Sequence, residues 1–364
     1  MLSERVKHLR DISVNTKPYL SGERADLLTR FYQTNGGIKS STPVTRALAF
    51  KYILENKHIF IDKGELIVGE RGPAPRATPT YPELCCHSLQ DLDILNTREQ
   101  ASFTVHDNVR RLYREKIIPY WKGKSMRERV FTAMTDEWHS AFEAGLFTEF
   151  MEQRAPGHAI LDNKIYYRGL LDFKQDIEKA IAILDFQKDS ETACKKQELL
   201  AMVITIDALI QFANRHAEKA LELARTEKNV QRKKELEKIA EICSHVPAHA
   251  PRSFWEALQM YWFVHLGVVT ELNVWDSFNP GRLDQHLFPF YAKELANGTL
   301  TKKFAKELLQ CFWIKFNNQP APPKVDITVE QSGTYQDFAL INTGGLTKDG
   351  KDAVNAVSYL LLEV

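Results

Sequence analysis

The chain has 364 residues, of which 44% are hydrophobic, 26% charged and 10% aromatic, a composition typical of a globular protein that buries its own core. Lys and Arg contribute 48 residues and Asp and Glu 47, and this balance removes the electrostatic argument for a nucleic-acid-binding protein. No apolar run of about 18 residues could span a membrane, and no apolar signal sequence follows Met1. We therefore expect a cytoplasmic protein that makes no membrane contact.

Five cysteines are present, and no two of them form a Cys-x-x-Cys pair. An odd number at irregular spacing argues against a disulfide framework and against a zinc knuckle. The sequence therefore predicts a reduced protein without a bound metal. The cysteines are Cys85, Cys86, Cys194, Cys243 and Cys311.

The N-terminal part is expected to be helical. Ser21 can cap a helix that starts at Gly22, and Thr42 followed by Pro43 is a favourable start for a second helix. From Val44 to Asn56 the apolar residues recur at roughly helical spacing, so we predict that the second helix covers this range.

The pattern changes after residue 59. A short apolar run lies between Gly64 and Gly69 and predicts a strand. The segment from Arg71 to Pro82 contains four prolines, and because proline has no backbone N–H to donate, we expect an extended loop there.

Helices dominate the rest of the expected structure. Two long stretches are predicted, Asp107–Ala144 with a break at Pro119 and Tyr167–Ser244, and the charged run 231–238 is expected to be a solvated helix face. Ser253–Val269 is apolar on nearly all sides, which predicts a buried helix. A polar loop at 271–281, an amphipathic helix to about Asn297, a helix at 302–316, a proline-rich turn at 320–323 and a short strand at 337–342 are expected to follow.

The last residues form a strongly apolar helical pattern from Ala353 to Val364. The pattern ends without a glycine, a basic last turn or another stop signal. We therefore expect the natural chain to continue beyond Val364, which would make this a truncated protein.

Two short motifs could carry chemistry, although a structural interpretation is favoured for each. Cys85-Cys86-His87 could place a thiolate beside a base, or it could be a buried pair of small residues. His245 and His249 could bind a metal, but Pro247 between them breaks the helix that would align them, so a turn at a helix end is favoured. Phosphate-loop, zinc-protease, nucleophile-elbow and dinucleotide-binding motifs are absent from the sequence.

Three polar clusters are stronger candidates for a pocket. The first groups Phe150 and Arg154 with Pro156-Gly157-His158, where His158 could face a cleft or serve a structural role. The second, 273–282, could form a pocket rim, or it could be an interhelical loop in which Asp276 or Ser277 caps the next helix. The third, 331–338, leads into the expected strand and could be an ordinary turn.

Three motifs follow one another along the chain: Glu70–Pro75 with the following Ala77–Glu83, Arg154–His158, and Trp275–Gln285. In this order they resemble the motifs of glycyl radical enzymes of the pyruvate formate-lyase type. The resemblance runs from Leu2 to Val364, so we interpret residues 1–364 as the N-terminal portion of one such domain. Within the family it is greatest to the hydroxyproline dehydratases; glycerol or diol dehydratases and a non-catalytic remnant are the alternatives.

The resemblance implies an α/β fold, the helix-rich N-terminal half of a ten-stranded barrel wrapped in helices. Two opposed loops inside such a barrel carry a cysteine and a glycine. No bound cofactor is implied; an iron–sulfur activating enzyme that uses S-adenosylmethionine installs the glycyl radical, and the closed barrel protects it from bulk water and oxygen. An anaerobic enzyme that forms a homodimer when full length is expected.

The chain departs from the family at the centre of this chemistry. The radical cysteine normally lies in a Gly-Cys-x-Glu loop, and none of the five cysteines has that context. The Arg-Val-x-Gly loop is absent as well, because Arg129-Val130 is followed by Phe131-Thr132. The glycine radical domain is therefore missing, and we expect the chain alone to be inactive.

The resemblance implies roles for five residues. His158 is the expected catalytic residue, in a polar relay toward the absent glutamate and the departing hydroxyl group. Asp276 is expected to bind the ring ammonium of the substrate and Ser332 its carboxylate, while Phe150 and Phe338 form apolar walls. The implied reaction converts trans-4-hydroxy-L-proline to pyrroline-5-carboxylate and water. Asp276 favours this substrate over a diol, because a neutral diol offers the carboxylate no cation.

Overall fold

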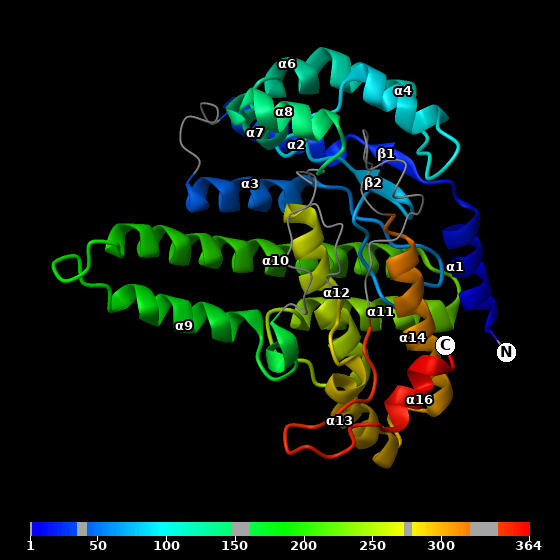
Figure 1. Ribbon diagram of the computed structural model, residues 1–364. Coiled ribbons are helices and arrows are strands. Elements are labelled where there is room, and N and C mark those ends of the chain that lie inside the picture. The colour runs from blue at the N-terminus through cyan, green and yellow to red at the C-terminus, as the bar shows by residue number, and fades with distance from the viewer. Residues whose placement is uncertain (1, 35–41, 148–160, 273–278, 321–340) are drawn as a thin grey trace.

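The computed structural model describes residues 2–34, 42–147, 161–272, 279–320 and 341–364, and all structural statements concern these ranges. Within them the chain is mainly helical, as the sequence predicts (Figure 1). A π-helical turn, Tyr113–Ile117, joins α5 to α6, and a 3₁₀ turn, Asp162–Tyr166, precedes α9. The helices are α1 (Glu4–Asn15), α2 (Glu23–Thr34), α3 (Pro43–Asn56), α4 (Leu89–Thr97), α5 (Asp107–Leu112), α6 (Ile118–Trp121), α7 (Met126–Ala133), α8 (Asp136–Glu143), α9 (Leu170–Ala182), α10 (Thr192–Thr226), α11 (Val230–His245), α12 (Phe254–Glu271), α13 (Leu283–Ala296), α14 (Lys302–Asn317) and α16 (Ala356–Leu362).

Strands β1 (Tyr19–Ser21) and β2 (Ala77–Pro79) form a parallel pair in which Leu20 lies opposite Thr78. Strand β2 corrects the expectation of a loop without regular structure from Arg71 to Pro82. A two-stranded pair tolerates prolines around β2, because one edge of each strand needs no backbone donor. Within the described ranges this pair is the only sheet, so these ranges show the helix-rich portion of the implied fold and not its barrel.

Several predicted helix starts are confirmed. The hydroxyl of Thr42 accepts a hydrogen bond from the backbone of Thr45 at 3.1 Å, and Pro43 begins α3. Ser253 caps α12 in the same way through the backbone of Glu256, at 3.2 Å. The start of α2 is Glu23, one residue later than predicted.

The predicted strand at residues 64–69 is wrong, although the segment is buried as its apolar pattern indicates. The side-chain amide of Gln259 donates to the carbonyl of Val68 and accepts from its N–H, both at 2.9 Å. The indole N–H groups of Trp255 and Trp262 donate to the carbonyls of Leu66 and Gly69 at 2.8 and 2.9 Å. Side chains of α12 therefore satisfy the backbone groups that a neighbouring strand would otherwise satisfy.

The two long helical stretches are divided differently from the prediction. The first is interrupted at residues 122–125 and again at 134–135, whereas Pro119 lies in the first turn of α6, where no N–H is needed. The second consists of α9, α10 and α11. In the charged run 231–238, Lys233 and Lys234 are exposed as predicted, but Glu235 is buried and paired with Arg5.

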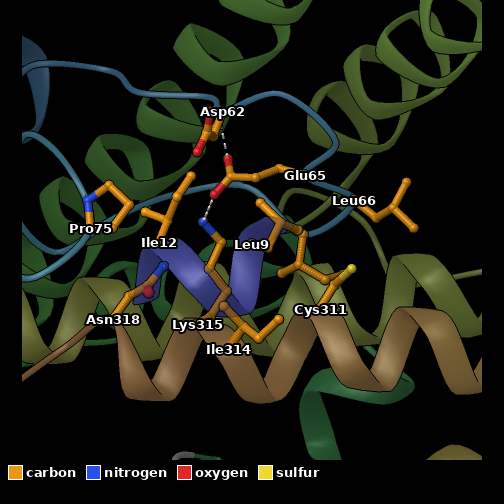
Figure 2. A pocket seen from close by; sticks show the side chains of 11 residues that line it. Leu9, Ile12, Asp62, Glu65, Leu66, Pro75, Cys311, Ile314, Lys315 and Asn318 are labelled. Atoms are coloured by element: carbon orange, nitrogen blue, oxygen red, sulfur yellow. Dashed lines mark hydrogen bonds and ion pairs between the residues drawn. The ribbon is translucent and has the colours of Figure 1, made fainter. Parts of the chain in front are cut away.

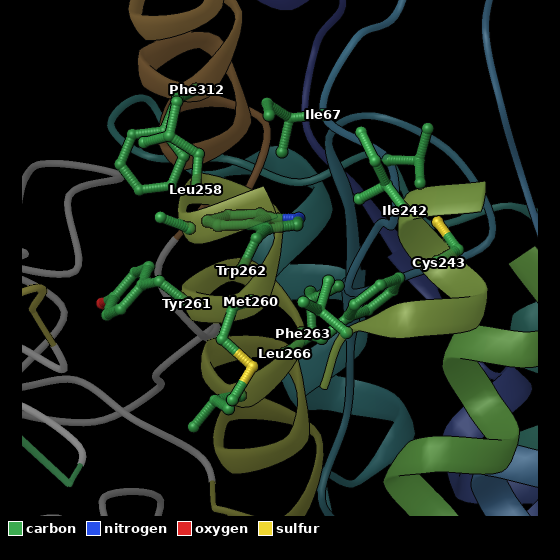
Figure 3. Packing of buried hydrophobic residues seen from close by; sticks show 14 of the residues in the cluster. Ile67, Ile242, Cys243, Leu258, Met260, Tyr261, Trp262, Phe263, Leu266 and Phe312 are labelled. Atoms are coloured by element: carbon green, nitrogen blue, oxygen red, sulfur yellow. The ribbon is translucent and has the colours of Figure 1, made fainter. Parts of the chain in front are cut away.

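Helix α12 lies at the centre of the main core. All of its residues except Trp255, Val268 and Glu271 are buried, and its aromatic and aliphatic side chains pack against residues 67 and 242–243 and against Phe312 of α14 (Figure 3). A second core lies among α2–α6 and includes Trp121, whose indole donates to Thr29 Oγ1 at 2.9 Å. The buried helix predicted at 253–269 is confirmed, and the burial of so many apolar residues is the largest stabilising contribution to this core.

The first and last helices, α1 and α16, both contact α14 (Figure 1). Asn355 caps α16, its side chain accepting from Val357 N at 2.8 Å, so the predicted C-terminal helix is present from Ala356. The predicted helices at about 283–297 and 302–316 are confirmed as α13 and α14. The expected strand at 337–342 and turn at 320–323 lie mostly outside the described residues. Within the described ranges, the helices are too short or too polar to cross a bilayer.

Candidate functional site

All five residues expected at the substrate pocket lie outside the described residues. They are Phe150, His158, Asp276, Ser332 and Phe338. The structure does describe the parts of the chain that precede and follow them. These flanking parts, together with the motif segment 70–83, make up the candidate functional site.

The motif segment is anchored by a buried lysine of the loop after α3. Lys57 Nζ donates to the carbonyls of Glu70 and Arg71 at 3.0 and 2.9 Å. Burial lowers the pKa of Lys57 to about 8. Gly72, the residue after Arg71, has no room for a side chain, because an added Cβ would lie 2.5 Å from the carbonyl oxygen of Ala77. The backbone at the start of the motif is therefore fixed from two sides.

The carboxylate of Glu70 belongs to a buried ion cluster with Lys315 of α14. Figure 2 shows the part of this cluster in which Lys315 contacts Glu65. Lys315 Nζ donates to Glu70 Oε1 at 2.8 Å and also to Glu65, and Asn318 donates to Glu70 at 2.9 Å. Burial raises the pKa of Glu65, while the two carboxylates outweigh the effect of burial on Lys315 and raise its pKa. The cluster joins the motif segment to α14, and a cavity of about 10 Å³ lies beside it.

The next residue, Arg71, connects the motif segment to the end of α12. Its guanidinium donates to the hydroxyl oxygen of Tyr81 at 2.8 and 3.2 Å, and the Tyr81 hydroxyl donates to the carbonyl of Val269. Arg71 Nη1 also lies 3.5 Å from the carbonyl oxygen of Pro320, where the described part of the chain after α14 ends. Arg71 and Tyr81 thus contact the chain near both residues 273–278 and residues 321–340.

Two further arginines contact the last turn of α12. Arg24 of α2 donates to the carbonyl of Thr270 at 2.7 Å and pairs with Glu83 at 2.5 Å. Arg46 of α3 pairs with Glu271. Positive charge at a helix C-terminus interacts favourably with the helix dipole, so this arrangement stabilises the turn that leads toward Asp276.

The end of the motif Trp275–Gln285 is also held by hydrogen bonds. Asp284, fully buried in α13, accepts from the backbone N–H of Gly344 at 2.6 Å and from the Ser358 hydroxyl. Gln285 donates to the carbonyl of Gly344 at 2.9 Å. These bonds fix the chain that follows residues 321–340. Because Arg282 is the N-cap of α13, neither Asp276 nor Ser277 caps this helix, and that alternative is wrong.

The two residues that follow residues 148–160 have an unusual backbone conformation. Leu161 and Asp162 have φ angles of +57° and +47°, a region that non-glycine residues rarely adopt. A carboxylate oxygen of Asp162 lies 3.5 Å from Nε2 of the buried His286 in α13, and the His286 ring packs against Tyr166. The chain beyond residues 148–160 is thereby attached to α13.

The thiol–imidazole alternative at Cys85-Cys86-His87 gains no support. Burial raises the pKa of Cys86 to about 12, which disfavours the thiolate that a nucleophile needs. None of the five cysteines forms a disulfide within the described residues.

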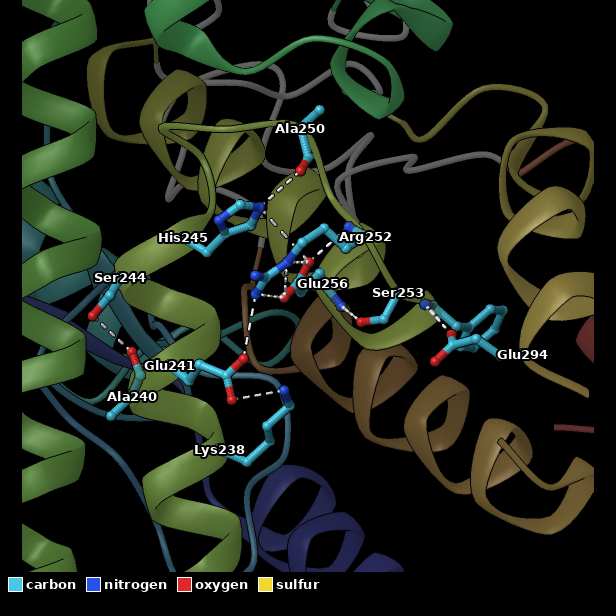
Figure 4. Close-up of polar contacts among 11 residues, drawn as sticks. Lys238, Ala240, Glu241, Ser244, His245, Ala250, Arg252, Ser253, Glu256 and Glu294 are labelled. Carbon is cyan, nitrogen blue, oxygen red and sulfur yellow. Dashed lines mark hydrogen bonds and ion pairs between the residues drawn. The ribbon is translucent and has the colours of Figure 1, made fainter. Parts of the chain in front are cut away.

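The two histidines at the end of α11 form a structural turn, as the favoured interpretation predicts. Their rings stack with centroids 5.2 Å apart. His245 Nε2 also bonds the carbonyl of Ala250 at 2.9 Å, as Figure 4 shows. Nearby, Arg252 pairs with the buried Glu256 at 2.6 Å. The described residues contain no group of three or more metal-ligating side chains.

Sequence reasoning missed the contacts of the buried polar residues that hold this region together. Lys315 could have been noticed, because it lies among aromatic and aliphatic residues on an otherwise apolar helix face. Arg24, Tyr81 and Asp284 carry no such local signal, since their partners lie far away in sequence.

The fold and these motif contacts define the class of protein. Residues 2–364 match the model of the family described as pyruvate formate lyase-like, and the chain belongs to this family. The resemblance found in the sequence is therefore confirmed.

Curated relatives are similar to the chain over nearly its whole length. The trans-4-hydroxy-L-proline dehydratase of Clostridioides difficile is 52% identical over 361 residues, which cover 99% of this chain and 46% of the relative. The isethionate sulfite-lyase of Nitratidesulfovibrio vulgaris is 33% identical and is covered to 44%. The chain thus spans about half the length of the curated relatives it matches.

Solved structures agree with this relationship. The crystal structure of the hydroxyproline dehydratase from C. difficile, with trans-4-hydroxy-L-proline bound, matches all of this chain with a TM-score of 0.96 and is covered to 46%. A glycerol-bound glycerol dehydratase from Clostridium butyricum matches with a TM-score of 0.89 at 31% identity, over 45% of its length. The described structure thus corresponds to the N-terminal portion of such enzymes.

Proposed function

We propose that this chain is the N-terminal portion of a glycyl radical lyase that dehydrates trans-4-hydroxy-L-proline to pyrroline-5-carboxylate and water. The observation that carries the proposal is the 52% identity to the C. difficile dehydratase over 361 residues. The glycerol dehydratase of known structure is 31% identical, which supports a diol or glycerol substrate less strongly.

The proposed pocket uses one charge and two apolar walls from this chain. Asp276 would bind the secondary ammonium of the substrate, where a charge-assisted hydrogen bond is strong in a dry site. Ser332 would bind the substrate carboxylate, and Phe150 and Phe338 would fix the ring. His158 would lie in the polar relay toward the departing 4-hydroxyl group.

The rest of the enzyme would come from sequence beyond these 364 residues. A glycyl radical, installed by an iron–sulfur activating enzyme that uses S-adenosylmethionine, would supply the species that abstracts the hydrogen atom next to nitrogen. We propose that the complete protein is a cytoplasmic homodimer of an anaerobic organism. The alternative is a non-catalytic remnant. A downstream reading frame that encodes Gly-Cys-x-Glu would support the enzyme, and one that lacks it would support the remnant.

The substrate assignment is tested by changing Asp276 to Asn in the complete protein, which keeps the shape of the side chain and removes its charge. Loss of a buried charge-assisted contact should cost on the order of 2–4 kcal/mol. That is a decrease of very roughly 30- to 1,000-fold in kcat/KM for trans-4-hydroxy-L-proline. A decrease of no more than about threefold, which is under 1 kcal/mol, would contradict this assignment and favour a diol as the substrate.

Glycerol and 1,2-propanediol provide the matched comparison. Their turnover by the wild-type protein should be far slower than that of trans-4-hydroxy-L-proline, because neither brings a cation to Asp276. Rapid turnover of either diol, unchanged by Asp276→Asn, would assign the protein to the diol dehydratases instead.

A further inference from the structure

The motif segment 70–83 contacts the C-terminal ends of two different helices. One is α12, which precedes residues 273–278, and the other is α14, which precedes residues 321–340. The last four carbonyls of an α-helix have no partner within the helix and must be satisfied from outside. Side chains of the motif segment satisfy such carbonyls on both helices.

At the end of α12 the contact is made by Tyr81. Tyr81 is 3% exposed, and its hydroxyl donates to the carbonyl of Val269. The guanidinium of Arg71 donates to the same hydroxyl oxygen, which orients the phenol O–H toward Val269. Because the hydroxyl has one proton, these contacts use its single donor.

At the end of α14 the contact is made by Arg76. Its Nη1 donates to the carbonyl of Asn317 at 2.6 Å, and its backbone N–H donates to the carbonyl of Asn318 at 2.9 Å. Arg76 is 8% exposed and has a φ angle of +65°, which is uncommon for a residue with a side chain. Such strain persists only where the surrounding contacts hold the residue in place.

We propose that segment 70–83 is a positioning element of the substrate pocket, in which Tyr81 sets the end of α12 and Arg76 sets the end of α14. The proposal rests on the proposed function, which places Asp276 after α12 and Ser332 after α14. Tyr81 therefore acts on the ammonium side of the substrate and Arg76 on its carboxylate side. Neither residue is catalytic, since each acts through a helix end.

The test uses Tyr81→Phe and Arg76→Met in the complete protein, with dissociation constants measured for three ligands. These are trans-4-hydroxy-L-proline, 3-hydroxypyrrolidine, which lacks the carboxylate, and 3-hydroxycyclopentanecarboxylate, which lacks the ring nitrogen. Tyr81→Phe should raise the dissociation constant of 3-hydroxypyrrolidine about tenfold, the equivalent of about 1.4 kcal/mol. It should change the dissociation constant of 3-hydroxycyclopentanecarboxylate by no more than about twofold. Arg76→Met should do the reverse, weakening the binding of 3-hydroxycyclopentanecarboxylate and leaving that of 3-hydroxypyrrolidine nearly unchanged.

Ile239→Val in the core of α11 is the control for a general loss of stability, because Ile239 is 1% exposed and the change leaves a small cavity. It should lower the melting temperature and leave the ratio of the dissociation constants unchanged. If Tyr81→Phe, Arg76→Met and Ile239→Val weaken all ligands alike, the two side chains are merely structural and the inference is wrong.

Hydrogen exchange separates the inference from the proposed function. Tyr81→Phe should speed amide exchange at 269–272 and not at 314–319, whereas Arg76→Met should do the opposite. If the complete wild-type protein binds none of the ligands, the hydroxyproline assignment fails. The exchange pattern alone then decides whether these residues set the helix ends. Equal acceleration at both helix ends in both variants would overturn the positioning roles.

Discussion

The ammonium group of Lys315 lies 2.8 Å from Oε1 of Glu70, although 245 residues separate the two in sequence. Both side chains are 2% exposed, and Glu65 is the second carboxylate bound to the same ammonium. A cation shared by two buried carboxylates compensates charge that could not be buried alone. This cluster is therefore where the link between the motif segment and α14 is most sensitive to substitution.

Lys315→Met should lower the free energy of unfolding by about 3–5 kcal/mol, because it leaves two buried carboxylates without their cation. Urea denaturation measures the change. Lys302→Met, at an exposed lysine of the same helix that pairs with Glu363 at 3.2 Å, is the control and should change stability by less than about 1 kcal/mol. Similar effects of the two substitutions would contradict the assigned role of the cluster.

Gln259→Leu should lower the free energy of unfolding by about 2–5 kcal/mol, because it leaves the buried N–H and carbonyl of Val68 without partners. Met260→Leu, at the fully buried neighbouring position of α12, removes no hydrogen bond and should cost less than about 1.5 kcal/mol. Both values follow from denaturant unfolding. A Gln259→Leu variant as stable as Met260→Leu would show that side chains of α12 do not replace strand pairing at residues 65–69.

His216 should make stability depend on pH in the acid range. Burial lowers the pKa of His216 to about 3 in the folded chain, from 6.5 in the unfolded chain. Between these values the unfolded chain binds a proton that the folded chain does not, so the free energy of unfolding falls as the pH falls. The slope from this residue is about 1.4 kcal/mol per pH unit.

The measurement compares the free energy of unfolding at about pH 5.5 and 4.5 for the wild type and His216→Leu, whose slope should be smaller by about 1.4 kcal/mol per unit. Phe212→Leu, at a neighbouring side chain of the same core, should shift stability equally at both pH values. An unchanged slope in His216→Leu would mean that His216 is protonated in the folded protein.

The 364-residue chain should show no glycyl radical after incubation with an activating enzyme, S-adenosylmethionine and a reductant, because its sequence contains neither radical-bearing motif. Electron paramagnetic resonance checks this. The complete C. difficile relative, treated in parallel, is the positive control. A glycyl doublet on the chain itself would refute the expectation.

The sequence predicts α12 well because its signal is local. The apolar residues after Ser253 are close enough together to indicate burial on all sides. The strand at 64–69 was predicted wrongly for a related reason. An apolar run between glycines indicates burial, but it cannot show whether the backbone is bonded by a strand or by side chains of a distant helix such as Gln259.

The candidate site, too, could be predicted from the sequence only in part. The motif around Arg71 is recognisable in the sequence and indicates the family. The match of residues 2–364 to the family model confirms that assignment. Three other bonds are not recognisable in the sequence, because each joins residues more than 70 positions apart. They are the bonds of Tyr81 with Val269, Lys315 with Glu70, and Ser358 with Asp284. The roles expected for Asp276 and His158 remain predictions, since those residues lie outside the described ranges.

The sequence distance between Glu70 and Lys315 also has a consequence for synthesis of the protein. At about 5–20 residues per second, the ribosome needs roughly 12–50 s to make the 245 residues that separate them. During that interval Glu65 and Glu70 have been made and their shared cation has not. The segment around them therefore cannot bury its carboxylates until α14 is translated, and the nascent chain must stay soluble, or be held by a chaperone, until then.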